Sequence, residues 1–366
     1  MRLLLSIFIL LTIQIGATDI STCKSCHPVI YNEFQQSIHK KSTVKEDAVH
    51  RAVWDKHPAK PKGNYKCAKC HTPESKDANS HQGITCISCH TITHIEEHTK
   101  ANKNIYETKD KTLYSAQKGM EDKKIVYKEE SSWFGLVKKT TGSPYHDIDY
   151  RNQDFYTGNV CMGCHSHKQN GKGFDVCRTS MEGAKSKETN CISCHMPKVN
   201  GSATTIREGK QHAFHGFAGL HTAPDMLAEY ITISYNKKSD KKFEINITNA
   251  APHNLVTHPL RLLQLRTTLK RAGKKETLET HTFVKAIGTD NKPSMPWLAT
   301  QVVKDNMIKA NEQRIISFDQ ELQSGDEVET TLGYYIVNPK AAKKLGITDE
   351  KFTTFTPLKS AYFNVK

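Results

Sequence analysis

The chain has 366 residues, and 52 lysines and arginines against 38 acidic residues give it a formal net charge of +14. Apolar residues make up 37% of the sequence, which is low for a chain of this length that buries a core with side chains alone. No segment beyond the N-terminus has transmembrane length, which excludes a polytopic membrane protein. The length suggests two domains, and the positive charge favours anionic partners or substrates.

The first 17 residues predict a secretory signal peptide. Arg2 precedes an apolar run that extends to Ile15, and the small residues Gly16 and Ala17 end the segment. The apolar run is short for a membrane span, although an uncleaved N-terminal anchor is the alternative. We therefore expect a periplasmic protein that is exported by a cleaved signal peptide.

Five copies of the pattern Cys-x-x-Cys-His contain ten of the eleven cysteines. This pattern attaches a c-type haem, because both thiols add to the haem vinyl groups and the histidine ligates the iron. A zinc site or a thioredoxin-like dithiol would not need a histidine after every second cysteine. We therefore expect five covalently attached c-type haems. The cysteines are Cys23 and Cys26, Cys67 and Cys70, Cys86 and Cys89, Cys161 and Cys164, and Cys191 and Cys194, and the histidines are His27, His71, His90, His165 and His195.

The chain has many further candidates for the second axial position of each iron. Nineteen histidines, of which five belong to the motifs, leave fourteen for five positions. A haem with two strong ligands carries electrons, whereas an open position binds substrate. The surplus favours two histidines at most or all of the haems. His39, at the end of a predicted helix over 31–38, and His212 and His215, in an aromatic and glycine-rich stretch, are singled out by their context.

Residues 18–226 predict an irregular, mainly helical haem domain with polar, lysine-rich connections. The letters Cys-Ile-Ser-Cys-His occur at Cys86 and again at Cys191, each time after another motif, which suggests two di-haem units; chance similarity is the alternative. Between these pairs, Ile125–Tyr127 and Trp133–Val137 predict a hairpin or a short helical excursion.

Residues 227–366 contain no motif and predict an antiparallel β-sandwich, so the expected fold class is α+β. Apolar and polar residues alternate there with a period of two, and turn-forming residues separate several of the runs. The predicted strands are Tyr230–Tyr235, Phe243–Thr248, Leu262–Leu269, Thr280–Ile287, Arg314–Leu322, Val328–Val337 and Ala361–Val365.

Several stretches resemble the periplasmic multihaem c-type cytochromes that include the tetrahaem electron acceptor of hydroxylamine oxidation. The resemblance implies that His39 and His146 are distal ligands of haems elsewhere in the fold. A further stretch is similar to the start of a C-terminal sandwich in some relatives, where the matching histidine reaches back to a haem; this makes His253 a candidate ligand, although Pro252 stands where a glycine is commoner. The stretches are Cys23–His27 with Tyr31 and Ser37–His39, Cys67–Pro73, Ser143–His146, Cys191–Pro197, and Ile247–His253 with Pro259–Arg261.

The predicted function is electron transfer between a quinol-linked or dehydrogenase donor and a terminal reductase, with no catalytic residue and no nucleic acid. Docking of the sandwich to a membrane complex is compatible with this. The alternative is an oxidoreductase that acts on a small nitrogen or sulfur compound at an open haem. Pentahaem nitrite reductases carry a lysine in one motif, and this chain has no Cys-x-x-Cys-Lys. Cys177 is either a substrate-side thiol or metal ligand, or an unpaired buried thiol.

Overall fold

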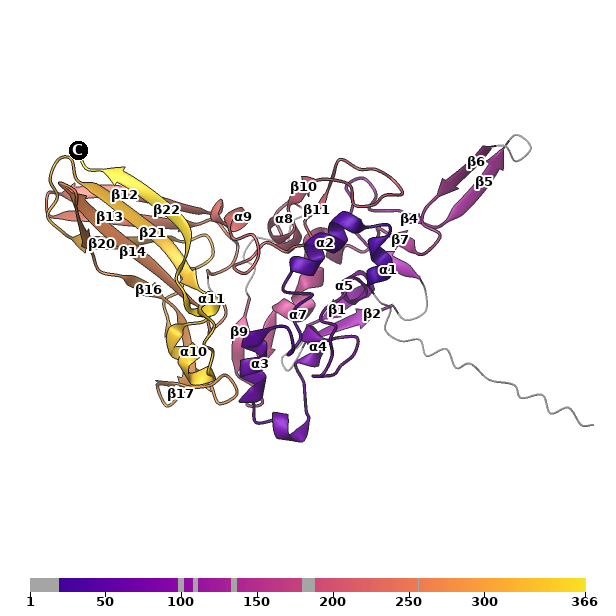
Figure 1. Cartoon of the computed structure of the whole chain (residues 1–366), viewed down its shortest axis with the longest axis horizontal. Coiled ribbons are helices and arrows are strands. Elements are labelled where there is room, and N and C mark those ends of the chain that lie inside the picture. Colours follow the sequence, from indigo (N-terminus) through magenta and orange to yellow (C-terminus); the bar gives the residue numbers. More distant parts are fainter. Residues whose placement is uncertain (1–19, 98–101, 108–110, 133–136, 180–187, 256) are drawn as a thin grey trace, which may run out of the picture.

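The computed structural model describes residues 20–97, 102–107, 111–132, 137–179, 188–255 and 257–366. The part that carries the motifs lies beside the C-terminal sheets, which are drawn in orange and yellow (Figure 1). The predicted signal peptide and the apolar residues 133–136 lie outside the described residues. No helix in the described part of the chain is long and apolar enough to cross a membrane.

The first part of the chain is irregular, as predicted, but short strands are as frequent in it as helices. Each motif needs only one helical turn, because residues i, i+3 and i+4 share a helix face. The helices are α1 (Ser21–Lys24), α2 (Pro28–Gln36), α3 (Ala48–Asp55), η1 (Lys60–Lys62), α4 (Ala68–His71), α5 (Cys86–His90), α6 (Asp154–Thr157), η2 (Asn159–Cys161), α7 (Met162–His165), α8 (Cys191–His195) and α9 (Asp225–Ala228). The strands are β1 (Ile92–Glu96), β2 (Lys103–Tyr106), β3 (Thr112–Tyr114), β4 (Lys124–Ile125), β5 (Lys128–Ser132), β6 (Val137–Thr141), β7 (Asp147–Asp149), β8 (His167–Gln169), β9 (Asp175–Arg178), β10 (Lys198–Asn200) and β11 (Gln211–Ala213).

The two identical motif helices, α5 and α8, begin in the same way. The side chain of Thr85 accepts a hydrogen bond from the Ser88 backbone, and Ser88 caps the Thr85 N–H in return. Asn190 and Ser193 form the same reciprocal arrangement at α8. The serine inside each motif therefore helps to start the helix, because it satisfies an N–H group that the first turn leaves free.

Strands β5 and β6 form an antiparallel hairpin, which projects from the rest of the protein (Figure 1). The predicted hairpin over Ile125–Tyr127 and Trp133–Val137 differs in its residues: Ile125 belongs to β4, which pairs with β7, and of the second run only Val137 lies among the described residues, in β6. Arg207 Nη2 donates a hydrogen bond to Thr140 O at 3.3 Å, which connects the base of the hairpin to a loop of the haem-motif part.

The C-terminal part contains two antiparallel sheets that share one core. One sheet has the order β12-β13-β20, and the other has the order β15-β14-β21-β22 with β16 also paired to β14. Phe243, Ile245 and Ile247 of β13 and Leu265 of β14 are fully buried in this core. The strands are β12 (Ile231–Ser239), β13 (Lys242–Asn249), β14 (Leu262–Arg271), β15 (Lys274–Thr277), β16 (His281–Phe283), β20 (Gln313–Asp319), β21 (Glu327–Tyr335) and β22 (Thr356–Asn364).

The predicted strand over 280–287 is divided between two sheets. Its second half joins β17 (Lys285–Thr289), which pairs with β18 (Lys292–Pro293) and β19 (Gln301–Asp305) in a separate small sheet. The side chain of Asn306 accepts a hydrogen bond from Val284 N at 2.9 Å, at the point where the chain leaves β16.

The small sheet and two short helices connect the C-terminal part to the haem-motif part. Val176 of β9 packs with Ile287 and Ala299 in one buried cluster. Ala48 and Val49 of α3 pack against a second cluster that is built on α10 (Pro339–Leu345) and α11 (Glu350–Thr353). The two parts are therefore joined by apolar contacts on more than one element.

Candidate haem-binding site

Eight of the nine predicted ligand histidines form four facing pairs of imidazole rings, each pair bringing together one motif histidine and one other. An iron atom between two imidazoles would separate the ring centroids by about 6 Å, since each metal–nitrogen bond is about 2 Å long and each centroid lies about 1 Å behind its nitrogen. The observed centroid separations and interplanar angles are 6.2 Å and 28° for His27 and His146, 6.3 Å and 17° for His90 and His215, 6.0 Å and 18° for His195 and His253, and 6.0 Å and 85° for His39 and His165.

Hydrogen bonds select the tautomer of six of these rings. A backbone carbonyl oxygen can only accept, so a ring whose Nδ1 faces one carries its proton there and leaves the Nε2 lone pair for a metal. The Nδ1 contacts are His27 to Ala203 O at 2.7 Å, His90 to Tyr114 O at 2.6 Å, His146 to Asp147 O at 3.2 Å, His195 to Ala218 O at 2.6 Å, His215 to Ala213 O at 2.7 Å and His253 to Asn254 O at 2.9 Å.

Burial favours the neutral form of five of these imidazoles. Desolvation lowers the pKa of His39 and of His215 to about 3, and it also lowers the pKa of His90, His165 and His253. A metal binds the neutral form of histidine, because the protonated ring has no free lone pair. The ring spacing, the tautomers and the neutral state all fit haem iron.

His71 is the exception among the predicted ligands. Its ring centroid lies only 4.1 Å from that of His50, which leaves no room for an iron atom between them. Both rings direct Nδ1 to the same acceptor, Ser42 O, at 3.1 Å from His71 and 2.9 Å from His50. The Nε2 of His50 then accepts from the Tyr65 hydroxyl at 3.1 Å. Among the described residues, no other histidine ring makes a ring contact with His71.

Thiol contacts show which motifs are neighbours in space. Cys23 and Cys86, Cys70 and Cys164, and Cys161 and Cys191 lie close enough for each pair of thiols to shift one another's pKa. The motifs at 161 and 191 are thus adjacent, as their repeat suggested, whereas the motif at 67 contacts the one at 161 rather than the one at 86. All eleven cysteines are free of disulfide bonds.

Cys177 lies on β9, opposite Lys168 of β8. Burial raises the pKa of its thiol, although Lys285 and Lys168 act in the opposite direction. The thiol is therefore protonated at neutral pH and is a poor nucleophile or metal ligand. This environment favours the interpretation of Cys177 as an unpaired buried thiol.

The sequence did not predict that Glu33 and His212 hold the segment of His215 in place. Glu33 Oε2 accepts from the His215 backbone N–H at 2.9 Å, and Glu33 Oε1 lies 2.9 Å from Nε2 of the buried His212. The Nδ1 of His212 lies 3.0 Å from Gly201 O. Glu33 and His212 come from segments far apart in the chain, so no spacing pattern predicts their contact.

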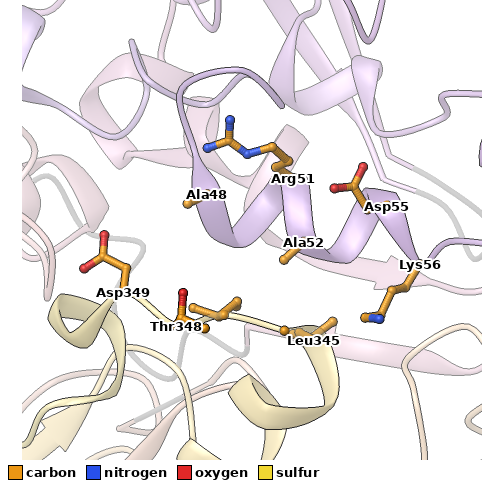
Figure 2. Close-up of a pocket in the computed structure, with 10 residues that line it drawn as sticks. Ala48, Arg51, Ala52, Asp55, Lys56, Leu345, Thr348 and Asp349 are labelled. Carbon is orange, nitrogen blue, oxygen red and sulfur yellow. The ribbon is translucent and has the colours of Figure 1, made fainter.

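A groove of about 410 Å³ lies between α3 and the segment that joins α10 to α11 (Figure 2). Arg51, Asp55 and Lys56 line one side, and Leu345 and Asp349 belong to the other. None of its lining residues belongs to a Cys-x-x-Cys-His motif or to a facing ring pair. The groove is therefore separate from the candidate haem-binding residues.

Comparisons with known proteins relate part of the chain to a cytochrome family and its fold to a solved structure. Residues 22–91 match the family described as cytochrome c554 and c-prime. No curated protein matches the chain. The structure is similar to the crystal structure of a penta-heme cytochrome c552 from Thermochromatium tepidum, with a TM-score of 0.72 and 21% identity over 94% of this chain and 98% of that one.

A second solved structure is the CARDB domain of the PF1109 protein from Pyrococcus furiosus in complex with di-metal ions. The alignment covers 37% of this chain and 93% of that domain, at 13% identity. The TM-score of 0.19 is too low to indicate a shared fold. The match to the penta-heme protein, at 21% identity, shows a shared fold. The five motifs, the ring pairs and the family match together support a multihaem c-type cytochrome with covalently bound haem.

Proposed function

We propose that this protein is a periplasmic pentahaem c-type cytochrome that transfers electrons between respiratory proteins. In this proposal residues 1–17 are the signal peptide, residues 18–226 hold the haems and residues 227–366 form a β-sandwich domain. The donor is a quinol-linked protein or a dehydrogenase, and the acceptor is a terminal reductase. The five motifs support the number of haems, and the signal-like N-terminus supports the periplasm.

The four facing ring pairs carry the proposal. Each motif histidine of a pair would hold the iron of its haem together with His146, His215, His39 or His253, and the bound haem would supply the electron-carrying iron. An iron with two imidazole ligands is low-spin and changes little in geometry when its oxidation state changes, which suits electron transfer. The chain's own role is to fix the rings through carbonyl acceptors and to exclude water from them.

The thiol proximities indicate which haems would be neighbours along an electron route. Cys23 contacts Cys86, and Cys89 lies within electrostatic range of Cys161 and Cys164. The first, third and fourth motifs therefore form a connected series. The second and fifth motifs both contact the fourth, so we propose an array in which the fourth haem connects the others.

Two measurements test the proposal. The mass of the mature protein should equal that of the chain from Thr18 plus five haems, and titration with a one-electron reductant should consume five electrons per chain. The fully reduced protein should then be reoxidised by a protein acceptor without any small substrate. A smaller number of haems, or reoxidation only in the presence of a small substrate, would contradict it.

The geometry at His71 supports a second candidate function. If His71 is the only protein ligand of its haem, the opposite face is open to a small nitrogen or sulfur compound, and the other haems supply electrons. Adding nitrite, hydroxylamine or sulfite to the oxidised protein should then change a high-spin EPR signal, and the reduced protein should consume the same compound catalytically. An oxidised protein with five low-spin signals rules out this function.

A further inference from the structure

Six aromatic rings form a continuous series of contacts that runs from a haem motif to the C-terminal part of the protein. Two of the six are tryptophans, of which the chain has three. None of the six belongs to the four facing ring pairs. The centroid separations are 4.1 Å between His71 and His50, 5.7 Å between His50 and Tyr65, 5.0 Å between Tyr65 and Trp54, 5.8 Å between Trp54 and His57, and 5.1 Å between His57 and Trp297.

The middle of this aromatic series is buried against the second haem motif. Trp54 and Tyr65 are only 6% and 8% exposed, and together with Ala68 they form one buried cluster. Cys67, the first thiol of the motif, packs against the same cluster. The two rings that are readily oxidised by one electron therefore lie next to a haem-attachment site and are shielded from solvent.

The Tyr65 hydroxyl has a proton acceptor within hydrogen-bond distance. It donates to His50 Nε2 at 3.1 Å, because Nδ1 of that ring already donates to Ser42 O at 2.9 Å. Burial raises the pKa of Tyr65, so the hydroxyl keeps its proton at neutral pH. A tyrosine that loses one electron becomes a strong acid and releases this proton. His50 Nε2 can take it, so oxidation of Tyr65 needs no proton transfer to distant water.

The other end of the aromatic series lies near the surface. Trp297 is half-buried in the loop between β18 and β19, next to Leu298, whose side chain is 46% exposed. His57, which contacts the Trp297 ring, is also half-buried, and its Nδ1 accepts a hydrogen bond from Ala59 N at 3.1 Å. The aromatic series therefore connects a buried haem motif to an indole that dissolved reductants can approach.

We propose that Tyr65, Trp54 and Trp297 form a relay that supplies electrons to the haem at His71 when hydrogen peroxide reacts there in the fully oxidised protein. The oxidising equivalents move outward from Tyr65 through Trp54 and His57 to Trp297, which protects the haem from damage. This role goes beyond electron transfer between proteins. It rests on the second candidate function, because peroxide needs the open face of the haem at His71.

The reaction balances with the groups in the relay. Cleavage of the O–O bond of hydrogen peroxide to give two water molecules takes two electrons and two protons, and the haem mediates this one-electron chemistry. Tyr65 and Trp297 each lose one electron. The phenolic proton of Tyr65 passes to His50 Nε2, the indole proton of Trp297 passes to solvent, and solvent supplies the two protons that form water. The iron ends in the ferric state in which it began.

Tyr65→Phe and Trp54→Phe in the haem-loaded protein test the relay, because each keeps an aromatic ring but removes the group that is readily oxidised. Tyr145→Phe is the control, since Tyr145 is 69% exposed and lies outside the aromatic series, next to the candidate ligand His146. Each oxidised protein is mixed with one equivalent of hydrogen peroxide and frozen for EPR. Ring-deuterated tyrosine identifies a tyrosyl radical, and peptide mass spectrometry measures oxygen addition at Trp297.

The wild type and Tyr145→Phe should both form a tyrosyl radical and contain oxidised Trp297. Tyr65→Phe should lose the tyrosyl radical. Trp54→Phe should keep it, with a slower decay, and should lose the oxidation at Trp297. The proposal is wrong if the wild type forms no tyrosyl radical, if Tyr65→Phe retains it, or if Trp54→Phe leaves the oxidation of Trp297 at the wild-type level.

Trp297→Phe keeps the test decisive if the variants inside the buried cluster do not fold. Trp297 is half-buried in a loop, so its replacement should leave haem incorporation intact. Its tyrosyl radical should decay more slowly than that of the wild type, and an unchanged decay overturns the proposal. Haem content and the EPR spectrum before peroxide is added test the proposed functions separately. A high-spin haem without a tyrosyl radical supports the second candidate function and refutes the relay, whereas five low-spin haems without a radical refute both.

Discussion

Replacing His50 should leave the spin state of every haem unchanged, whereas replacing His146 should convert one low-spin haem to high-spin. Both histidines lie within ring-contact distance of a motif histidine. The His146 ring lies 6.2 Å from its partner, which admits an iron atom, and the His50 ring lies 4.1 Å from His71, which does not. The wild-type protein should accordingly show one high-spin haem and four low-spin haems.

The free-energy cost of moving the His50 ring follows from the hydrogen bonds that hold it in place. To face His71 across an iron atom, the ring would have to retreat by about 2 Å and give up its hydrogen bonds to Ser42 O and Tyr65 Oη. Two such bonds contribute about 1–3 kcal/mol in total. These two bonds alone would not prevent His50 from ligating iron, so the prediction depends on α3 keeping its position. Ala48 and Val49 of α3 pack against the buried cluster at α10 and α11, and this packing holds the helix where the His50 ring is too close to His71 for an iron atom.

EPR of the oxidised proteins provides the assay. His50→Ala should reproduce the wild-type ratio of one high-spin haem to four low-spin haems. His146→Ala should give two high-spin haems and three low-spin haems. Haem content, measured for each variant, separates a lost ligand from a lost haem. If His50→Ala raises the high-spin signal and His146→Ala does not, the ring spacings have been interpreted incorrectly.

Three other variants test separate parts of the structure. His253→Ala should convert one low-spin haem to high-spin in the EPR spectrum, because this histidine faces His195. Leu265→Ala should lower the free energy of unfolding of the C-terminal part by about 2–5 kcal/mol in denaturant titrations, with unchanged EPR, because Leu265 is fully buried. The hydrogen bond from Arg151 holds the pKa of Asp149 below 3.8. Its stabilising effect is thus present above that value and lost as the pH falls through the lower folded-state pKa, so Asp149→Asn should flatten the decline in melting temperature below about pH 4.

The local elements were predictable because their signals are local. Each motif occupies one turn, and in strands such as β13 the buried residues alternate with less buried ones. The division of 280–287 between two sheets was not predictable, because the bend at Val284 depends on Asn306, more than twenty residues further along. The predominance of helix was overestimated because a haem motif needs only one turn.

The candidate distal histidines could be selected by context, but their partners could not. His39 faces the motif histidine His165, and His215 faces His90, each across more than one hundred residues of chain. His50 illustrates the same limit. It lies on α3 upstream of a motif, whereas α2 ends at Gln36 and His39 lies in the turn after it, not at the end of the helix predicted over 31–38. What separates it from His39 is tertiary: its Nε2 is occupied by the Tyr65 hydroxyl, and its Nδ1 shares a carbonyl with His71.

The contacts of the C-terminal part change how its role must be tested. Removing everything after Met226 would delete His253, which faces His195, and Tyr334, which holds the Leu220 turn. A truncated protein would therefore lose a candidate haem ligand together with any docking surface, and slower reduction by a partner could have either cause. Substitutions at exposed residues of the two sheets, such as Ile315 and Tyr362, leave the ring pairs in place. If these variants slow reduction by a native partner without changing the EPR spectrum, the C-terminal part contributes to docking as well as to haem binding.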